Sequence, residues 1–202
     1  MEVLLESGVS VDRISVIISI RETLATVCSW VEQFSFNAHP DSLVDNAVLA
    51  YHTVDQILKE ADALGIRNVT FDNRVLELNK SRIVLERFFD QLGLSHQQQV
   101  FSDWTQLPRM GTPESNIFFA DEPELYMSHD FHEKVIQSSG LNYFPKQMSK
   151  IVANLSREQV QKLIDGGVFK VYDRLRLRSV RDLELEIPES TELERYLEEI
   201  SK

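Results

Sequence analysis

Apolar residues recur at three- and four-residue intervals through much of the first half of the chain, which is the spacing of one face of an α-helix. The segments with this spacing are residues 11–36, 42–64 and 71–93. Gly65 and Gly93 follow the second and third segments, where glycine commonly ends a helix. Because short loops join the segments, we expect an N-terminal antiparallel helical bundle in residues 1–94.

The sequence changes character after this bundle. Pro108, Pro113 and Pro123 interrupt residues 95–127, so no long helix or strand is expected there. The same segment carries aromatic side chains, including Phe118, Phe119 and Tyr126. A long loop in a compact protein often carries function. We therefore expect an ordered aromatic strap, with its aromatic side chains as candidate interaction residues.

The remaining residues, 128–202, predict a smaller C-terminal unit that is again mainly helical. Helices are expected at about 128–138, 145–154, 156–165 and 191–200. The third of these is the best marked, because Ser156-Arg-Glu-Gln159 is a capping-box pattern and Gly166-Gly167 follows the helix.

Between the last two predicted helices, polar and apolar residues alternate from Arg174 to Ile187. Alternation with period two is typical of a β-strand that has one buried face. If the stretch folds back at Val180, basic side chains of the first half face acidic side chains of the second. The pattern therefore predicts a β-hairpin at about 168–187. The expected fold is mainly α: a helical bundle followed by a smaller helical unit that carries a β-hairpin.

The basic residues of this stretch also suggest a second function, nucleic-acid binding. The candidate phosphate-binding side chains are Lys170, Arg174, Arg176, Arg178 and Arg181. Two short helices followed by a basic hairpin resemble the order of elements in a winged helix, which implies a nucleic-acid-associated regulator. In the predicted hairpin, however, three of these arginines face carboxylates, which would neutralise the patch.

A third hypothesis, a metal-dependent hydrolase, rests on Ser128-His-Asp-Phe-His-Glu133. On a helix, His129 and His132 share one face, and Asp130 and Glu133 form a second pair three residues apart. Imidazole and carboxylate groups together can bind a divalent metal. The adjacent His129-Asp130 resembles the pair that names the HD phosphohydrolases, a family that also needs an upstream histidine and a downstream aspartate. The loose matches for those two positions are His52 and Asp165 or Asp182.

Composition narrows the choice among these functions. The 202 residues carry a net charge of −11, which disfavours general affinity for nucleic acid or anionic lipid. A single cysteine, Cys28, excludes an internal disulfide and indicates a reducing, cytoplasmic setting. We expect no signal peptide, because residues 1–10 carry Glu2 and Glu6 and no basic start. We expect no membrane span, because no apolar run approaches about 18 residues.

Sequence motifs of common enzymes are also missing: the chain has no GxGxxG, P-loop, GxSxG, HExxH or paired CxxC. We expect no cofactor. The segment 71–93 is apolar on more than one helical face, which is typical of a central or interfacial helix. Its candidate interaction residues are Leu76, Ile83 and Phe88. The favoured hypothesis is therefore a non-enzymatic interaction or assembly subunit, an adaptor or accessory protein that binds a protein partner or a second copy of itself.

Overall fold

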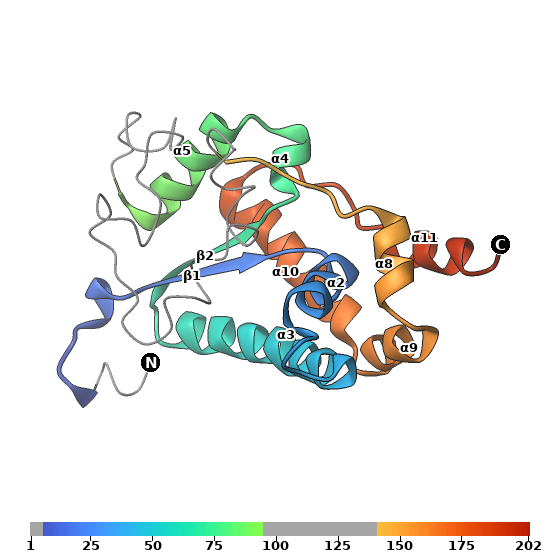
Figure 1. Ribbon diagram of the computed structural model, residues 1–202. Coiled ribbons are helices and arrows are strands. Elements are labelled where there is room, and N and C mark those ends of the chain that lie inside the picture. The colour runs from blue at the N-terminus through green and yellow to red at the C-terminus, as the bar shows by residue number, and fades with distance from the viewer. Residues whose placement is uncertain (1–5, 95–140) are drawn as a thin grey trace, which may run out of the picture.

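The computed structural model describes residues 6–94 and 141–202 and shows a mainly helical protein around a small parallel sheet (Figure 1). The N-terminal elements are η1 (Val11–Arg13), β1 (Ser15–Ile20), α2 (Thr23–Phe34), α3 (Pro40–Ala63), β2 (Arg67–Asp72), α4 (Val75–Leu78) and α5 (Ser81–Leu92). The C-terminal elements are α8 (Met148–Asn154), α9 (Arg157–Asp165), α10 (Val168–Leu183) and α11 (Glu192–Glu199).

The two strands pair in parallel, with Ser15 opposite Arg67 and Ile20 opposite Asp72. Parallel strands need a long crossover, and here α2 and α3 together provide it. In Figure 1 the strand pair lies between α3 below and α5 above. The prediction of a single helix at 11–36 is therefore wrong in its first half, which contains β1. The run Val16-Ile-Ile-Ser-Ile20 is rich in β-branched residues, which favour a strand.

Helix α3 confirms the predicted helix at 42–64. Its buried side chains include Val44, Ala47, Tyr51 and Leu58, which lie on one helical face. Pro40 occupies the first turn, where its missing N–H has no intrahelical partner to lose. The third predicted helix, 71–93, is divided instead into the end of β2, the short α4 and α5.

The C-terminal helices agree in part with the sequence pattern. The capping box of α9 is present: Ser156 Oγ accepts from Gln159 N, and Gln159 Oε1 accepts from Ser156 N. Helices α8 and α11 lie where helices were expected, although α8 begins at Met148. The predicted helix at 128–138 lies outside the described residues.

The predicted β-hairpin at about 168–187 is wrong, because residues 168–183 form one helix, α10. Its buried positions include Val171, Leu175, Ser179 and Leu183, each four residues apart, a spacing that fits both a strand face and a helix face. Leu177 decides between the two: alternation would bury it, yet it is 57% exposed. The wing of the winged-helix hypothesis is therefore absent.

The largest buried apolar cluster joins residues from both sides of the gap at 95–140. Leu24, Val27 and Val44 contribute from the N-terminal side, and Leu163 and Leu175 from the C-terminal side. A second cluster under α5 includes Val69, Val84 and Leu92 together with Leu183 and Ile187. Helix α10 contributes to both clusters and is thus central to the fold.

Candidate functional site

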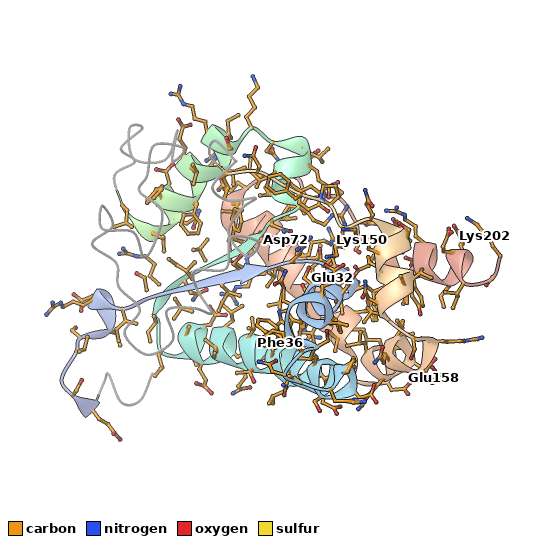
Figure 2. The ribbon with its side chains drawn as sticks, in the orientation of Figure 1. Glu32, Phe36, Asp72, Lys150, Glu158 and Lys202 are labelled. Carbon is orange, nitrogen blue, oxygen red and sulfur yellow. The ribbon has the colours of Figure 1, made fainter. Side chains whose placement is uncertain are left out.

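A group of buried ionisable side chains gathers where the two strands end. Asp72, the last residue of β2, is fully buried near the centre of the fold (Figure 2). Its Oδ2 accepts a hydrogen bond from the Tyr172 hydroxyl at 2.8 Å, and its Oδ1 accepts one from the backbone N of Arg74 at 3.0 Å. Burial raises the pKa of this carboxyl to about 6, although both hydrogen bonds act in the opposite direction.

Arg74 provides the positive charge of this group. Its Nη1 lies 3.1 Å from Glu22 Oε1, and its Nε lies 2.5 Å from Glu77 Oε1. The residue is only 7% exposed, so its charge is well placed to compensate the nearby carboxylates. Glu22 also accepts hydrogen bonds from the hydroxyls of Ser190, at 2.8 Å, and Tyr143, at 3.4 Å. Through these contacts, the ends of β1 and β2 are connected to the C-terminal segments that contain Tyr143 and Ser190.

Glu192 belongs to the same group from the C-terminal side. Its carboxyl oxygens accept from the backbone N of Leu24, at 2.9 Å, and of Ala25, at 3.3 Å. Helix α2 has no side-chain cap of its own, so Glu192 satisfies two of its unpaired N–H groups. Burial, together with the negative charge of Glu22, raises the pKa of Glu192 to about 8.

We call Glu22, Asp72, Arg74, Glu77 and Glu192 the ionic cluster. Each charged member contacts partners inside the protein. The part of the chain that the structure describes also contains no group of three or more His, Cys, Asp or Glu side chains that could bind a metal. The ionic cluster thus connects segments that lie far apart in the sequence, which is a structural role.

The raised pKa of Glu192 predicts how stability changes with pH. A carboxyl with a folded-state pKa above its unfolded value of about 4.3 stabilises the fold most below that value, and the contribution is lost as pH rises through about 8. Glu192→Gln remains neutral, so its free energy of unfolding should fall less than that of the wild type from pH 5 to 8. Urea unfolding at several pH values measures both curves. Parallel curves would contradict a raised pKa.

The second candidate site is the outer edge of β1. Ile20 O accepts from Asn73 N at 3.1 Å, so the even-numbered residues of β1 bond to β2. Backbone groups alternate in direction along a strand of a parallel pair. Ser15, Ile17 and Ser19 therefore direct their N–H and C=O groups away from β2. Within residues 6–94 and 141–202, no hydrogen bond reaches these outward groups.

The opposite edge of the sheet is covered by α10. Thr70 N donates to Asp182 Oδ2 at 2.9 Å, and Asp72 N donates to Ser179 Oγ at 2.9 Å. These two side chains of α10 accept hydrogen bonds from the outward N–H groups of Thr70 and Asp72. Polar side chains of α10 thus cover the β2 edge at Thr70 and Asp72, whereas the β1 edge has no such cover among the described residues.

The exposed side chains of β1 are not of the kinds that prevent a further strand from pairing with its open edge. Ser15, Ile17 and Ser19 are exposed, with Ile17 at 51%, and the strand contains no charged residue and no proline. Natural edge strands are commonly protected by such residues, because unpaired strands attract others. We call the outward backbone groups and exposed side chains of these three residues the β1 edge.

The arginines predicted to bind phosphate lie on α10, where most of them contact carboxylates. Arg178 makes a bidentate pair with Asp62, at 2.6 and 2.7 Å, and also approaches Asp182. Hydrogen bonds from Arg178 hold the pKa of Asp62 below its usual value. Arg174 pairs with Asp55 at 2.8 Å.

Among the other predicted phosphate-binding side chains, Arg176 is buried, with Nη1 on Ile187 O at 3.3 Å. Arg181 is exposed and lies 3.4 Å from Asp182, and Lys170 is exposed. The basic segment is therefore largely neutralised by its own fold.

The predicted interaction residues differ in exposure. Ile83 is 43% exposed, whereas Leu76 and Phe88 are half-buried against the second apolar cluster. Phe118, Phe119 and Tyr126 lie outside the described residues, as do the metal candidates His129, Asp130, His132 and Glu133.

The loose matches to the HD family have other contacts. His52 Nε2 lies 2.8 Å from Gly166 O, which joins α3 to the turn after α9. Asp165 accepts from Gln161 Nε2 at 2.9 Å, and Asp182 covers the β2 edge. The structure does not bring the three together into a shared contact.

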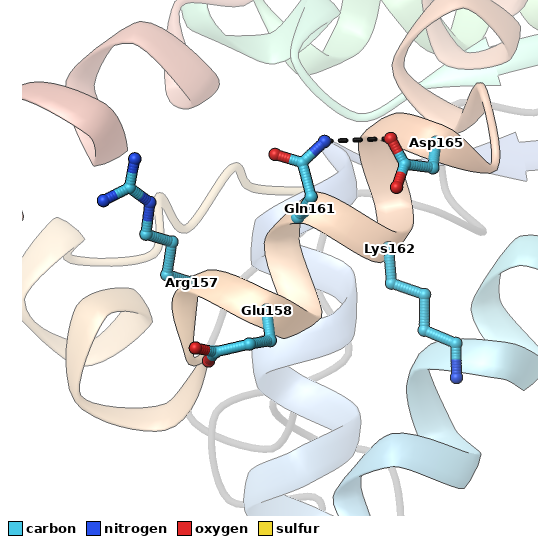
Figure 3. A pocket seen from close by; sticks show the side chains of 5 residues that line it. All are labelled: Arg157, Glu158, Gln161, Lys162 and Asp165. Carbon is cyan, nitrogen blue, oxygen red and sulfur yellow. Dashed lines mark hydrogen bonds between the residues drawn. The ribbon is translucent and has the colours of Figure 1, made fainter.

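A shallow hollow lies on α9 (Figure 3). Its lining residues are Arg157, Glu158, Gln161, Lys162 and Asp165. All belong to one helix, and Lys162 pairs at 2.6 Å with Asp45 of α3. The mixed charges are those of a solvated helix face, so the hollow does not point to a ligand.

Comparison with known proteins identifies no relative: no protein-family model, curated protein or solved structure matches the chain. Within the described residues, no helix is both long and apolar enough to span a lipid bilayer.

Proposed function

We propose that this protein is a non-enzymatic interaction or assembly subunit that binds another polypeptide by strand addition at the β1 edge. The observation that carries the proposal is the contrast between the two edges of the sheet. Helix α10 seals the β2 edge, whereas the outward groups of Ser15, Ile17 and Ser19 have no hydrogen-bond partner among residues 6–94 and 141–202.

Strand addition uses such groups directly. A bound strand would give main-chain hydrogen bonds to the β1 edge, and its side chains would lie beside those of β1. Ile17 is opposite Val69 and Ser19 is opposite Phe71 in the existing sheet. Phe71 packs edge-to-face on Phe88 of α5, with ring centroids 6.0 Å apart. The β1 edge therefore borders an apolar surface, which supports binding of an apolar strand.

Cross-linking in cells tests the proposal. We expect a diazirine-bearing amino acid at position 17 to give covalent adducts with another polypeptide on illumination, because a bound strand would lie within contact of that side chain. Mass spectrometry of the purified adducts identifies the captured chain.

The same amino acid at position 49 provides the control, since Leu49 is 66% exposed on α3, outside the sheet. Adducts at both positions in equal yield, or at neither, would contradict the proposal.

A further inference from the structure

The β1 edge has the features required to pair with a second copy of itself. We infer that two chains associate through antiparallel pairing of their β1 strands about a two-fold axis that passes by Ile17. The inference rests on the proposed function and names the partner. An isologous contact of this kind needs a self-complementary surface, because each residue meets its symmetry counterpart.

Backbone geometry selects the register. In an antiparallel pair, opposite residues point to the same face of the sheet, so residues with outward groups must pair with each other. Centring the axis at Ile17 places Ile17 opposite Ile17 of the second copy and Ser15 opposite Ser19. This register uses the outward groups of all three residues in both chains and forms about six hydrogen bonds.

Side chains match on both faces in this register. On the exposed face, serine meets serine and isoleucine meets isoleucine. On the other face, Val16 lies opposite Ile18 of the second copy, and both are half-buried against the protein interior. Pairs of β-branched side chains across strands stabilise a sheet. An axis at Val16 or Ile18 would pair only two of the three outward residues within β1, and an axis between two residues would place inward-facing groups opposite outward ones.

Pairing of the two β1 strands would also extend the sheet. Two strands from each copy would form one four-stranded sheet with the order β2-β1-β1-β2, and α10 would seal both outer edges. A sheet of that size is within the ordinary range, whereas an isolated strand pair is marginal. Symmetric pairing therefore leaves no open strand edge in the described parts of either copy.

Net charge opposes the association. Each chain carries −11, so two copies repel each other at low ionic strength. The β1 edge itself has no charged residue, and screening should therefore tighten the pairing as salt is added. This salt dependence is opposite to that of a contact made by ion pairs.

Sedimentation equilibrium of the purified full chain tests the inference. We expect the wild-type mass to rise from one chain toward two with increasing concentration, and more readily at higher salt. Ile17→Lys should raise the dissociation constant by at least about tenfold, because an edge lysine disfavours strand pairing. Leu49→Lys, which adds the same charge elsewhere, should associate like the wild type. Circular dichroism checks that both variants remain folded.

A wild-type protein that stays monomeric at every concentration and salt level would overturn self-pairing, as would an Ile17→Lys variant that associates like the wild type. Cross-linking separates this failure from that of the proposed function. If position 17 captures a different polypeptide while the purified chain is monomeric, the partner is not a second copy but the β1 edge still binds a chain. If position 17 captures nothing above position 49, strand addition itself is excluded.

Discussion

Replacing Arg74 with methionine will lower the free energy of unfolding by about 3 kcal/mol, because it leaves largely buried carboxylates without their positive partner. The guanidinium lies between Glu22 and Glu77, and the backbone of the same residue contacts Asp72. Methionine retains most of the aliphatic volume, so lost charge compensation rather than lost packing dominates the change. Urea unfolding at neutral pH measures the effect.

Arg82→Met is the matched control for this substitution. Arg82 also pairs with a glutamate, Glu86, at 2.8 Å, but its side chain is mostly exposed on α5. An exposed pair of this kind contributes about 0.3 to 0.5 kcal/mol. Equal losses in the two variants would show that the ionic cluster contributes no more than a surface pair.

Leu175→Ala will cost about 2 to 5 kcal/mol, whereas Leu177→Ala will change stability by less than about 0.5 kcal/mol. Leu175 is buried in the main apolar cluster, while Leu177 projects from the outer face of α10. Both residues would be buried in an alternating strand, so the pair of variants separates the helix from the hairpin. Thermal or urea unfolding gives the two values.

Comparable large losses for Leu175→Ala and Leu177→Ala would contradict the helix. They would indicate that both leucines face one interior, as the period-two pattern alone suggests. The helix also predicts that Arg178→Met affects stability through Asp62 of α3 rather than through a facing strand.

Helices with one unambiguous apolar face could be predicted from the sequence. In α3 the apolar positions fit a helical period and conflict with a period of two. In α9 the cap is local, since Ser156 and Gln159 lie three residues apart and contact each other. Such elements depend on residues that are close together in the sequence, so the sequence alone is enough to predict them.

Helix α10 could not be predicted from the sequence, because its buried positions fit the period of a helix and also the period of a strand. Residues four apart, such as Leu175 and Ser179, lie on one face of a helix and on one face of a strand. Arg178 and Asp182 would be neighbours in either case, across a hairpin or one helical turn apart. Buried Arg176 and exposed Leu177 distinguish the two, and their burial depends on tertiary packing.

The ionic cluster and the β1 edge were missed for related reasons. Glu192 caps α2 from 168 residues away, and no local pattern signals a contact of that separation. β1 had a local signal in the β-branched residues Val16, Ile17 and Ile18, but the helical spacing of the surrounding apolar residues obscured it. Recognition of the edge also required β2, which forms the other half of the sheet.

The central claim is that the β1 edge receives another polypeptide strand, and the yield of cross-linked adducts at position 17 relative to position 49 tests it most directly. If a strand binds at the β1 edge, we expect adducts at position 17 that contain a defined polypeptide, and little product at position 49. Equal yields at the two exposed positions, or no product at position 17, would contradict it.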